Sequence, residues 1–263
     1  MRITSIGHAI FAATFIAFGI LGLSKGDFAP IWQDAPKGVP AREALAYLCA
    51  VVCVACGAGL LWPRTAAVAA RILLAYLLLW LLLVKMRVIL LAPAVEVAYQ
   101  SWGETAVIVA GAWTLYVRFA TGWDRRWLGF ASGATGLRIA RVLYGLAMIA
   151  FGLSHFVYLQ MTAPLVPDWL PWHVAWAYFT GAAYLAAGAA VLVGSCARLA
   201  AGLSTLQMGL FTLLVWVPIA ASAQMTASQW GEFGVSWALT AAGWVVAESY
   251  ALSRVAGTGF RRT

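Results

Sequence analysis

Eight long apolar segments follow one another along this chain and constrain its fold more than any other feature. An α-helix needs about 20 apolar residues to cross the hydrocarbon core of a bilayer, and each segment is close to that length. Charged residues make up only 10% of the chain, against about 25% in ordinary soluble domains. The sequence therefore predicts an all-α integral membrane protein with eight transmembrane helices. The segments are 5–23, 43–62, 66–84, 101–119, 138–157, 172–193, 197–219 and 231–252.

The charged residues indicate how these segments cross the membrane. The net charge of +8 comes from basic residues that are scattered between the segments and form no dense patch, which argues against nucleic-acid binding. Twelve of the 17 basic residues lie on one side of the predicted topology, and seven of the nine acidic residues lie on the other. By the positive-inside rule, both termini are expected in the cytoplasm, with the chain multi-pass in a bacterial-type inner (plasma) membrane. Apolar residues continue to Leu23 with no convincing cleavage site beyond them, so the first segment is expected to stay as a span.

The two halves of the chain carry matching residues. Trp102-Gly103-Glu104 matches Trp230-Gly231-Glu232, each at the start of the last segment of its half. Four spans per half is an even number, so both copies enter the membrane from the same side. This predicts two parallel four-helix repeats related by an axis along the membrane normal. Further matches are Phe18-Gly19 with Phe151-Gly152, Ala29-Pro30 with Ala163-Pro164, and Tyr47 and Gly57 with Tyr178 and Gly188, the last two at one common spacing.

The repeat divides the chain into four expected parts. Residues 1–120 form a first, diverged four-helix unit, and residues 121–137 form a basic cytoplasmic linker whose tryptophans and arginines suit the membrane interface. Residues 138–255 form a second four-helix unit, and 256–263 are a polar tail.

The second half carries a series of motifs along most of its length. They are Gly152, His155 and Phe156 at the end of a helix, the Ala-Pro…Val-Pro-x-Trp-Leu-Pro loop at 163–171, the Gly-Ala-rich helix at 181–189, and Val-Trp-Val-Pro at 215–218 followed by Trp230. In these motifs the second half resembles the DoxX-like family of small membrane proteins. The first half matches only weakly and looks like a diverged copy, with Lys85-Met86-Arg87 where the second half has Trp216-Val217-Pro218.

This resemblance implies a four-helix membrane unit, so the chain would be two fused units. Some members are similar to the quinone-linked subunit of thiosulfate oxidation, and others are associated with thiol and oxidative-stress proteins. A quinone, and a membrane or thiol-redox partner protein, are therefore expectations from the resemblance alone. It specifies the fold far better than the function.

His155 is the leading candidate for chemistry, because an ionisable group inside a membrane span is a functional hypothesis by default. The alternative is a structural hydrogen bond to a neighbouring helix. Asp168, in the outer loop, has three open roles: pairing with His155 to handle protons, capping the next helix, or facing water. Four tryptophans converge on this outer side and would line a ligand pocket, although a membrane-interface belt is the more economical explanation. They are Trp169, Trp172, Trp176 and Trp230.

Glu104 and Glu232 occupy equivalent positions in the two halves. At a helix N-terminus a carboxylate is stabilised by the macrodipole, and Ser101-x-x-Glu104 has the pattern of a capping box. Capping is the simpler interpretation. The sharper one pairs the two carboxylates in an outer cavity, and Glu232 is assigned to ligand binding on that basis.

Three of the four cysteines share one helix face and raise the question of redox chemistry. Cys49, Cys53 and Cys56 fall at i, i+4 and i+7, and the last two form a Cys-x-x-Cys. Their apolar surroundings disfavour a thiolate, so packing is the expected role. No spacing of Cys and His fits a metal, and no metal site is expected.

The functional expectation is a redox-associated membrane protein with an outward-facing pocket for a quinone or lipid-like molecule. Its alternatives are a non-catalytic membrane scaffold or partner subunit and a small-solute transporter. No span carries a charge at its predicted centre, which counts against ion-coupled transport. Whether the chain is an enzyme, and which cofactor it uses, stay open at this point.

Overall fold

Long helices account for nearly all of the structure. The computed structural model describes the backbone of residues 4–29, 33, 35–36, 38–222 and 224–259, and the side chains within these ranges up to residue 251. Over this described part the chain is helical, with no strand. Within the same residues, six helices are long and apolar enough to cross a membrane. They are Ile6–Lys25, Arg42–Leu61, Ala66–Leu91, Ala134–Val157, His173–Val193 and Ala197–Ala221.

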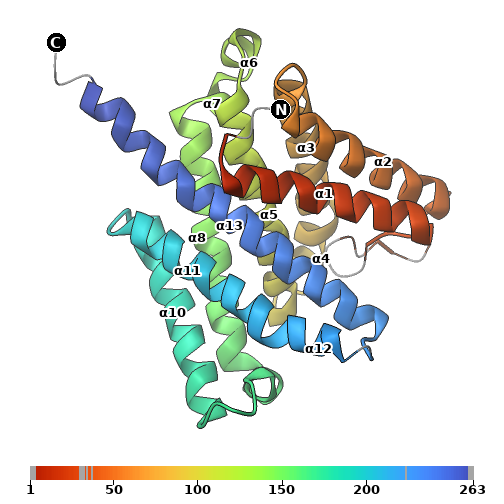
Figure 1. The fold of residues 1–263 in the computed structure, drawn as a ribbon, viewed down its shortest axis with the longest axis vertical. Helices are drawn as coiled ribbons and strands as arrows, with labels where there is room; N and C mark the ends of the chain where they lie inside the picture. Colours follow the sequence, from red (N-terminus) through yellow and green to blue (C-terminus); the bar gives the residue numbers. More distant parts are fainter. Residues whose placement is uncertain (1–3, 30–32, 34, 37, 223, 260–263) are drawn as a thin grey trace.

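The elements follow a similar order in the two halves (Figure 1). In the first half they are α1 (Ile6–Lys25), α2 (Arg42–Leu61), α3 (Ala66–Leu79), η1 (Trp80–Lys85), α4 (Met86–Leu91) and α5 (Glu96–Phe119). The linker holds α6 (Gly122–Trp127) and α7 (Gly129–Ser132). The second half contains α8 (Ala134–Val157), α9 (Leu159–Thr162), η2 (Ala163–Leu165), α10 (His173–Val193), α11 (Ala197–Phe211), η3 (Thr212–Trp216), α12 (Val217–Ala221) and α13 (Ala227–Gly259).

Helices α5 and α13 are the two expected spans that fall outside the six apolar helices. Both lie near the middle of the molecule, and they pack against each other (Figure 1). Helix α5 is buried almost without interruption from Gly103 to Tyr116. A helix surrounded by other helices needs small packing residues rather than a lipid-facing apolar surface, so its sequence is less hydropathic than that of the outer helices. Helix α5 also begins at Glu96, before the span expected from the sequence at 101–119.

The third helix of each half contains a π-helical segment in its later part. Segment η1 ends at Lys85 and segment η3 ends at Trp216, the two residues that the repeat pairs with each other. A π-helical segment inserts an extra residue into a helix and occurs frequently at functional sites. Its appearance at equivalent positions in both halves supports the match between Lys85-Met86-Arg87 and Trp216-Val217-Pro218.

Matched glycines bring the first two helices of each half into close contact. An added Cβ at Gly57 would lie 2.7 Å from the carbonyl oxygen of Ala12, and one at Gly188 would lie 2.7 Å from that of Gly145. The same holds for Gly19 against Ala50 and for Gly152 against Gly181. The two members of each pair make the same kind of contact, so the glycine matches predicted from the sequence mark a packing interface shared by the α1–α2 and α8–α10 pairs.

Polar contacts gather the helix ends at one end of the bundle. Arg118, at the end of α5, donates to the carbonyl oxygen of Thr4 at 3.0 Å. The backbone N–H of Gly7 donates to Glu248 of α13 at 3.3 Å, and Arg141 of α8 donates to the carbonyl oxygen of Ser249 at 2.9 Å. The start of α1 therefore lies beside the later part of α13. Of the charged residues used for the topology, Arg2, Asp34, Lys37, Arg261 and Arg262 lie outside the described residues, as does Pro30 of the repeat match.

Candidate functional site

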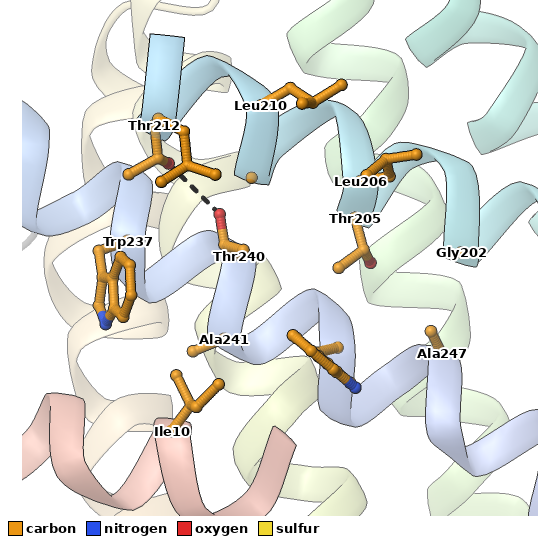
Figure 2. A pocket seen from close by; sticks show the side chains of 13 residues that line it. Ile10, Gly202, Thr205, Leu206, Leu210, Thr212, Trp237, Thr240, Ala241 and Ala247 are labelled. Carbon is orange, nitrogen blue, oxygen red and sulfur yellow. Dashed lines mark hydrogen bonds between the residues drawn. The ribbon is translucent and has the colours of Figure 1, made fainter. Parts of the chain in front are cut away.

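A pocket of about 450 Å³ lies between α11–η3 and α13 (Figure 2). Helix α1 contributes one residue to its wall, Ile10. The other residues come from the second half: Gly202, Thr205, Leu206, Gly209, Leu210, Thr212, Leu213, Trp237, Thr240, Ala241, Trp244 and Ala247. This volume falls within the roughly 300–1,000 Å³ that is typical of small-molecule sites.

The pocket opens among apolar side chains on the outside of the bundle. Leu206 and Leu213 are 56% and 54% exposed, and Trp237 is 41% exposed, although each also lines the pocket. Leu206 and Leu213 belong to Ala197–Ala221, one of the six helices that are long and apolar enough to cross a membrane, and Trp237 belongs to α13. The entrance therefore lies at the side of the bundle rather than at one of its ends.

Hydroxyl groups run along the back of the pocket. Tyr144 shares a hydrogen bond of 2.8 Å with Ser204 and one of 3.3 Å with Thr205. Further along, Thr212 shares a hydrogen bond of 2.6 Å with Ser236. It shares another of 3.4 Å with Thr240, which Figure 2 shows. Thr205 and Thr240 also donate to backbone carbonyls one helical turn earlier, at 2.7 and 3.0 Å. Their hydroxyl protons are thus used, and their oxygens retain acceptor capacity toward a molecule in the pocket.

The first half carries leucines where the second half has two of these threonines. At the spacing that pairs Tyr47 with Tyr178, Thr205 and Thr212 correspond to Leu74 and Leu81, which are 5% and 2% exposed. The second pocket described, of about 290 Å³, lies elsewhere, between α2 and α3–η1. Our sequence reasoning missed these hydroxyl groups, which we call the hydroxyl row: Tyr144, Ser204, Thr205, Thr212, Ser236 and Thr240. A usable signal was present, because these threonines interrupt an apolar segment whose counterpart reads leucine.

His155 sits beside α10 and makes a local hydrogen bond. Its Nδ1 lies 2.7 Å from the carbonyl oxygen of Phe151, which places the proton on Nδ1, and its ring packs against Tyr184 with centroids 5.5 Å apart. Next to His155 in the chain, Ser154 donates a hydrogen bond to the carboxylate of Glu96. No hydrogen bond or ion pair joins His155 to Asp168, both of which lie in the described part of the chain. Proton handling by His155 and Asp168 stays a prediction.

Asp168 and the four tryptophans lie on the surface of the molecule. Asp168 is exposed and does not cap α10, which begins after Trp172 without a side-chain cap. Trp169, Trp172 and Trp230 are 70%, 79% and 53% exposed, and Trp176 is 38% exposed. None of the four lines either of the two pockets described above. Their exposure is what an aromatic belt at the membrane interface would show.

Glu104 and Glu232 do not cap their helices, so that expectation is wrong. Helix α5 begins at Glu96, about two turns before Glu104. Helix α13 begins at Ala227, where Thr226 and Gln229 form reciprocal hydrogen bonds. Glu104 is 6% exposed and interacts electrostatically with Glu232 and Lys85. The two carboxylates are thus within electrostatic range of each other. The capping pattern did not predict this, because a local motif takes no account of a helix that starts earlier.

Lys85 is buried rather than extended to the membrane surface. It is 3% exposed and donates to the hydroxyl of Ser101 at 2.8 Å. A lysine near the end of an apolar helix often extends its charged end to the water at the membrane surface, but Lys85 does not. The charge stays inside because Ser101 and Glu104, both on α5, supply polar neighbours.

The cysteines of α2 pack inside the bundle as free thiols. Cys53 and Cys56 are 2% and 3% exposed, and Cys49 is half-buried at the wall of the smaller pocket. Cys196, the fourth, is exposed at the turn between α10 and α11. No group of three or more His, Cys, Asp or Glu side chains that would hold a metal ion occurs among the described residues.

Comparison with known proteins identifies one related family. A family model described as a domain of unknown function (DUF8561) matches residues 144–247, less than half of the chain. No curated protein and no solved structure matches the chain. The matched region begins at Tyr144 and ends at Ala247, so it contains the hydroxyl row and every lining residue of the 450 Å³ pocket except Ile10. The second half of the chain is therefore similar to this family in the part that forms the pocket.

Proposed function

We propose that this chain is an integral membrane protein that binds a neutral, lipid-like molecule in the pocket between α11–η3 and α13. The observation that carries the proposal is a pocket of about 450 Å³ that opens sideways among exposed leucines and tryptophans. The hydrocarbon core of a bilayer contains no water to fill such a space. An acyl or isoprenoid chain entering from the bilayer would fill the pocket and pack against its apolar walls.

The chemistry of the lining selects a neutral ligand. None of the lining residues carries a charge, so a phosphate or ammonium group inside the pocket would lack a counter-ion. The oxygens of Thr205 and Thr240 accept hydrogen bonds, and the indoles of Trp237 and Trp244 are donors. A quinone or its quinol has such a polar head and an isoprenoid tail, and the resemblance to DoxX-like proteins implies the same class of ligand.

The same proposal includes the topology. Helices α5 and α13 complete a set of eight spans, arranged as two parallel four-helix units with both termini in the cytoplasm of a bacterial-type plasma membrane. Support comes from the end of the bundle where Arg118 contacts Thr4 and Glu248 contacts Gly7, because an even number of spans returns the chain to its starting side. The excess of arginine at this end agrees with the positive-inside rule.

A non-catalytic role as a scaffold or partner subunit is the second candidate. It is favoured by the separation of the predicted site residues, since His155 bonds to its own helix and Asp168 faces outward. Occupation of the pocket distinguishes the two, because a scaffold needs no ligand there.

Filling the pocket tests the proposal. An added Cβ at Gly202 meets no atom within 4 Å, so Gly202→Phe places a ring in open space at the pocket wall. We expect the purified wild-type protein to carry a neutral amphiphile that mass spectrometry of its organic extract identifies, and Gly202→Phe to carry at least tenfold less.

The matched control introduces the same ring elsewhere on α11. Leu199 is 61% exposed and does not line the pocket, so Leu199→Phe should retain the ligand. Equal amounts of every extracted lipid in Gly202→Phe and Leu199→Phe would contradict the proposal.

A further inference from the structure

The linker between the two halves exposes aromatic and basic side chains together. Trp123, Trp127 and Phe130 are 53%, 63% and 65% exposed, and Arg125 and Arg126 between them are exposed as well. Arg126 lies over the ring of Trp127, 5.4 Å from its centroid. We call these five side chains the linker surface.

The linker surface is held in place from below by Asp124, which points into the protein. Asp124 is fully buried and accepts hydrogen bonds from Arg71 of α3 at 2.8 Å and from Tyr116 of α5 at 3.1 Å. Thr121 forms a capping box with it at the start of α6. The indole of Trp113 donates to the carbonyl oxygen of Ala131 at 2.9 Å, which fixes α7 to α5 as well. The outward side chains therefore project from an anchored backbone.

The linker surface is positively charged, because the acid of the linker is turned inward. Asp124 is the one acid between residues 121 and 137, and its charge is matched by Arg71. At the same end of the bundle, Arg64 and Arg138 are exposed, whereas Glu248 is engaged with the backbone of Gly7. An anion approaching the linker meets arginines without a competing carboxylate.

We propose that the linker surface binds the anionic headgroups of phospholipids in the leaflet that it faces. Tryptophan side chains are enriched at the level of the headgroups, and guanidinium groups form bidentate hydrogen bonds with phosphates. Figure 1 shows α6 and α7 at the end of the bundle, beyond the end of α8. In the proposed topology, on which this inference rests, the headgroups of one leaflet lie at this level. An arginine near an anionic membrane surface strengthens binding by roughly fivefold. The proposal is independent of the pocket between α11 and α13.

The experiment compares two double variants of the full-length protein that remove equal charge. Arg125→Gln with Arg126→Gln alters the linker surface, and Lys25→Gln with Arg87→Gln alters exposed basic residues elsewhere. Each protein in neutral detergent is titrated with phosphatidylglycerol or phosphatidylcholine, and the lipid-bound populations are measured by native mass spectrometry.

We expect the wild-type protein and the Lys25–Arg87 variant to prefer phosphatidylglycerol. The linker variant should bind it roughly 25-fold more weakly, with phosphatidylcholine binding unchanged, because two arginine contributions of roughly fivefold each are lost and multiply. An unchanged preference in the linker variant, or a wild-type protein that does not distinguish the two lipids, would overturn the inference. Loss of the pocket ligand in the Gly202→Phe test would leave this result unaffected.

Discussion

At the scale of single residues, two ion pairs show how burial decides what a charge contributes. Arg71 and Asp124 pair at 2.8 Å with the carboxylate fully buried, whereas Arg42 and Asp27 pair at 2.9 Å on the surface. Burial by itself opposes ionisation of Asp124. Hydrogen bonds from Arg71, Thr121 and Tyr116 outweigh that effect and hold its pKa well below the usual range of a carboxyl group.

Asp124→Asn should destabilise the protein by about 3 kcal/mol at neutral pH, because Arg71 is left without its buried counter-ion. Thermal unfolding in detergent measures the effect. The control is Asp27→Asn, whose exposed pair should contribute at most about 1 kcal/mol. Equal losses for the two variants would show that burial does not set the difference.

The low pKa of Asp124 also gives this contribution a pH dependence. A carboxyl group whose pKa is lowered by folding stabilises the native state at pH values above its unfolded pKa, which is about 3.9. The contribution is lost as the pH falls through the lower, folded pKa. The difference in unfolding midpoint between the wild-type protein and Asp124→Asn should therefore be constant from neutral pH to about pH 5 and shrink below about pH 4. A difference that shrinks already between about pH 7 and about pH 5 would contradict this account.

At the scale of elements, the sequence predicted helix ends and helix–helix contacts well where a short sequence pattern determines them. The α1–α2 and α8–α10 contacts follow from glycines that the repeat had already paired, Gly57 with Gly188 among them. Glu104 was misplaced for the converse reason. The Ser101-x-x-Glu104 pattern resembles a cap, but α5 starts at Glu96 and Glu104 lies buried in the interior, within electrostatic range of Glu232.

Gly188→Leu tests the close approach of α8 and α10. The new Cβ would lie 2.7 Å from the backbone oxygen of Gly145, which cannot move without shifting α8, so we expect a loss of about 1–3 kcal/mol and a lower unfolding midpoint. Gly202→Leu introduces the same side chain into another helix where no atom lies within 4 Å. That variant should be as stable as the wild-type protein or more so, since glycine costs a helix about 1 kcal/mol. Equal destabilisation would show that the effect comes from the residue type and not from the contact.

At the scale of the whole molecule, the two halves share an order of elements but have diverged in what they enclose. Both contain a π-helical segment in the third helix, yet only the second half has threonines where the first has Leu74 and Leu81. The related family matches this second half alone. The architecture is therefore common to both halves, whereas the hydroxyl-backed pocket belongs to one of them.

The proposed parallel arrangement of the two halves predicts which loops lie in the cytoplasm. Cys196, at the α10–α11 turn, is the one exposed cysteine of the four. It should react with a membrane-impermeant maleimide only after the cells are permeabilised. In a Cys196→Ser background, Asp168→Cys places an exposed thiol in the opposite loop and should react in intact cells. Labelling of Cys196 in intact cells would contradict the proposed orientation.

The sequence by itself determined that the chain is helical, roughly where most of its helices begin and end, and which glycines of the two halves correspond. These properties depend on the length of apolar runs and on residues that are close together in the chain. Only the tertiary structure decided what the polar side chains within those helices meet. The hydrogen bonds of Lys85 with Ser101 and of Thr212 with Ser236 each join different helices. Glu104 lies within electrostatic range of Glu232 on another helix. The pocket has the same origin, because it exists only where α11–η3 and α13 cross with small and hydroxyl-bearing residues between them.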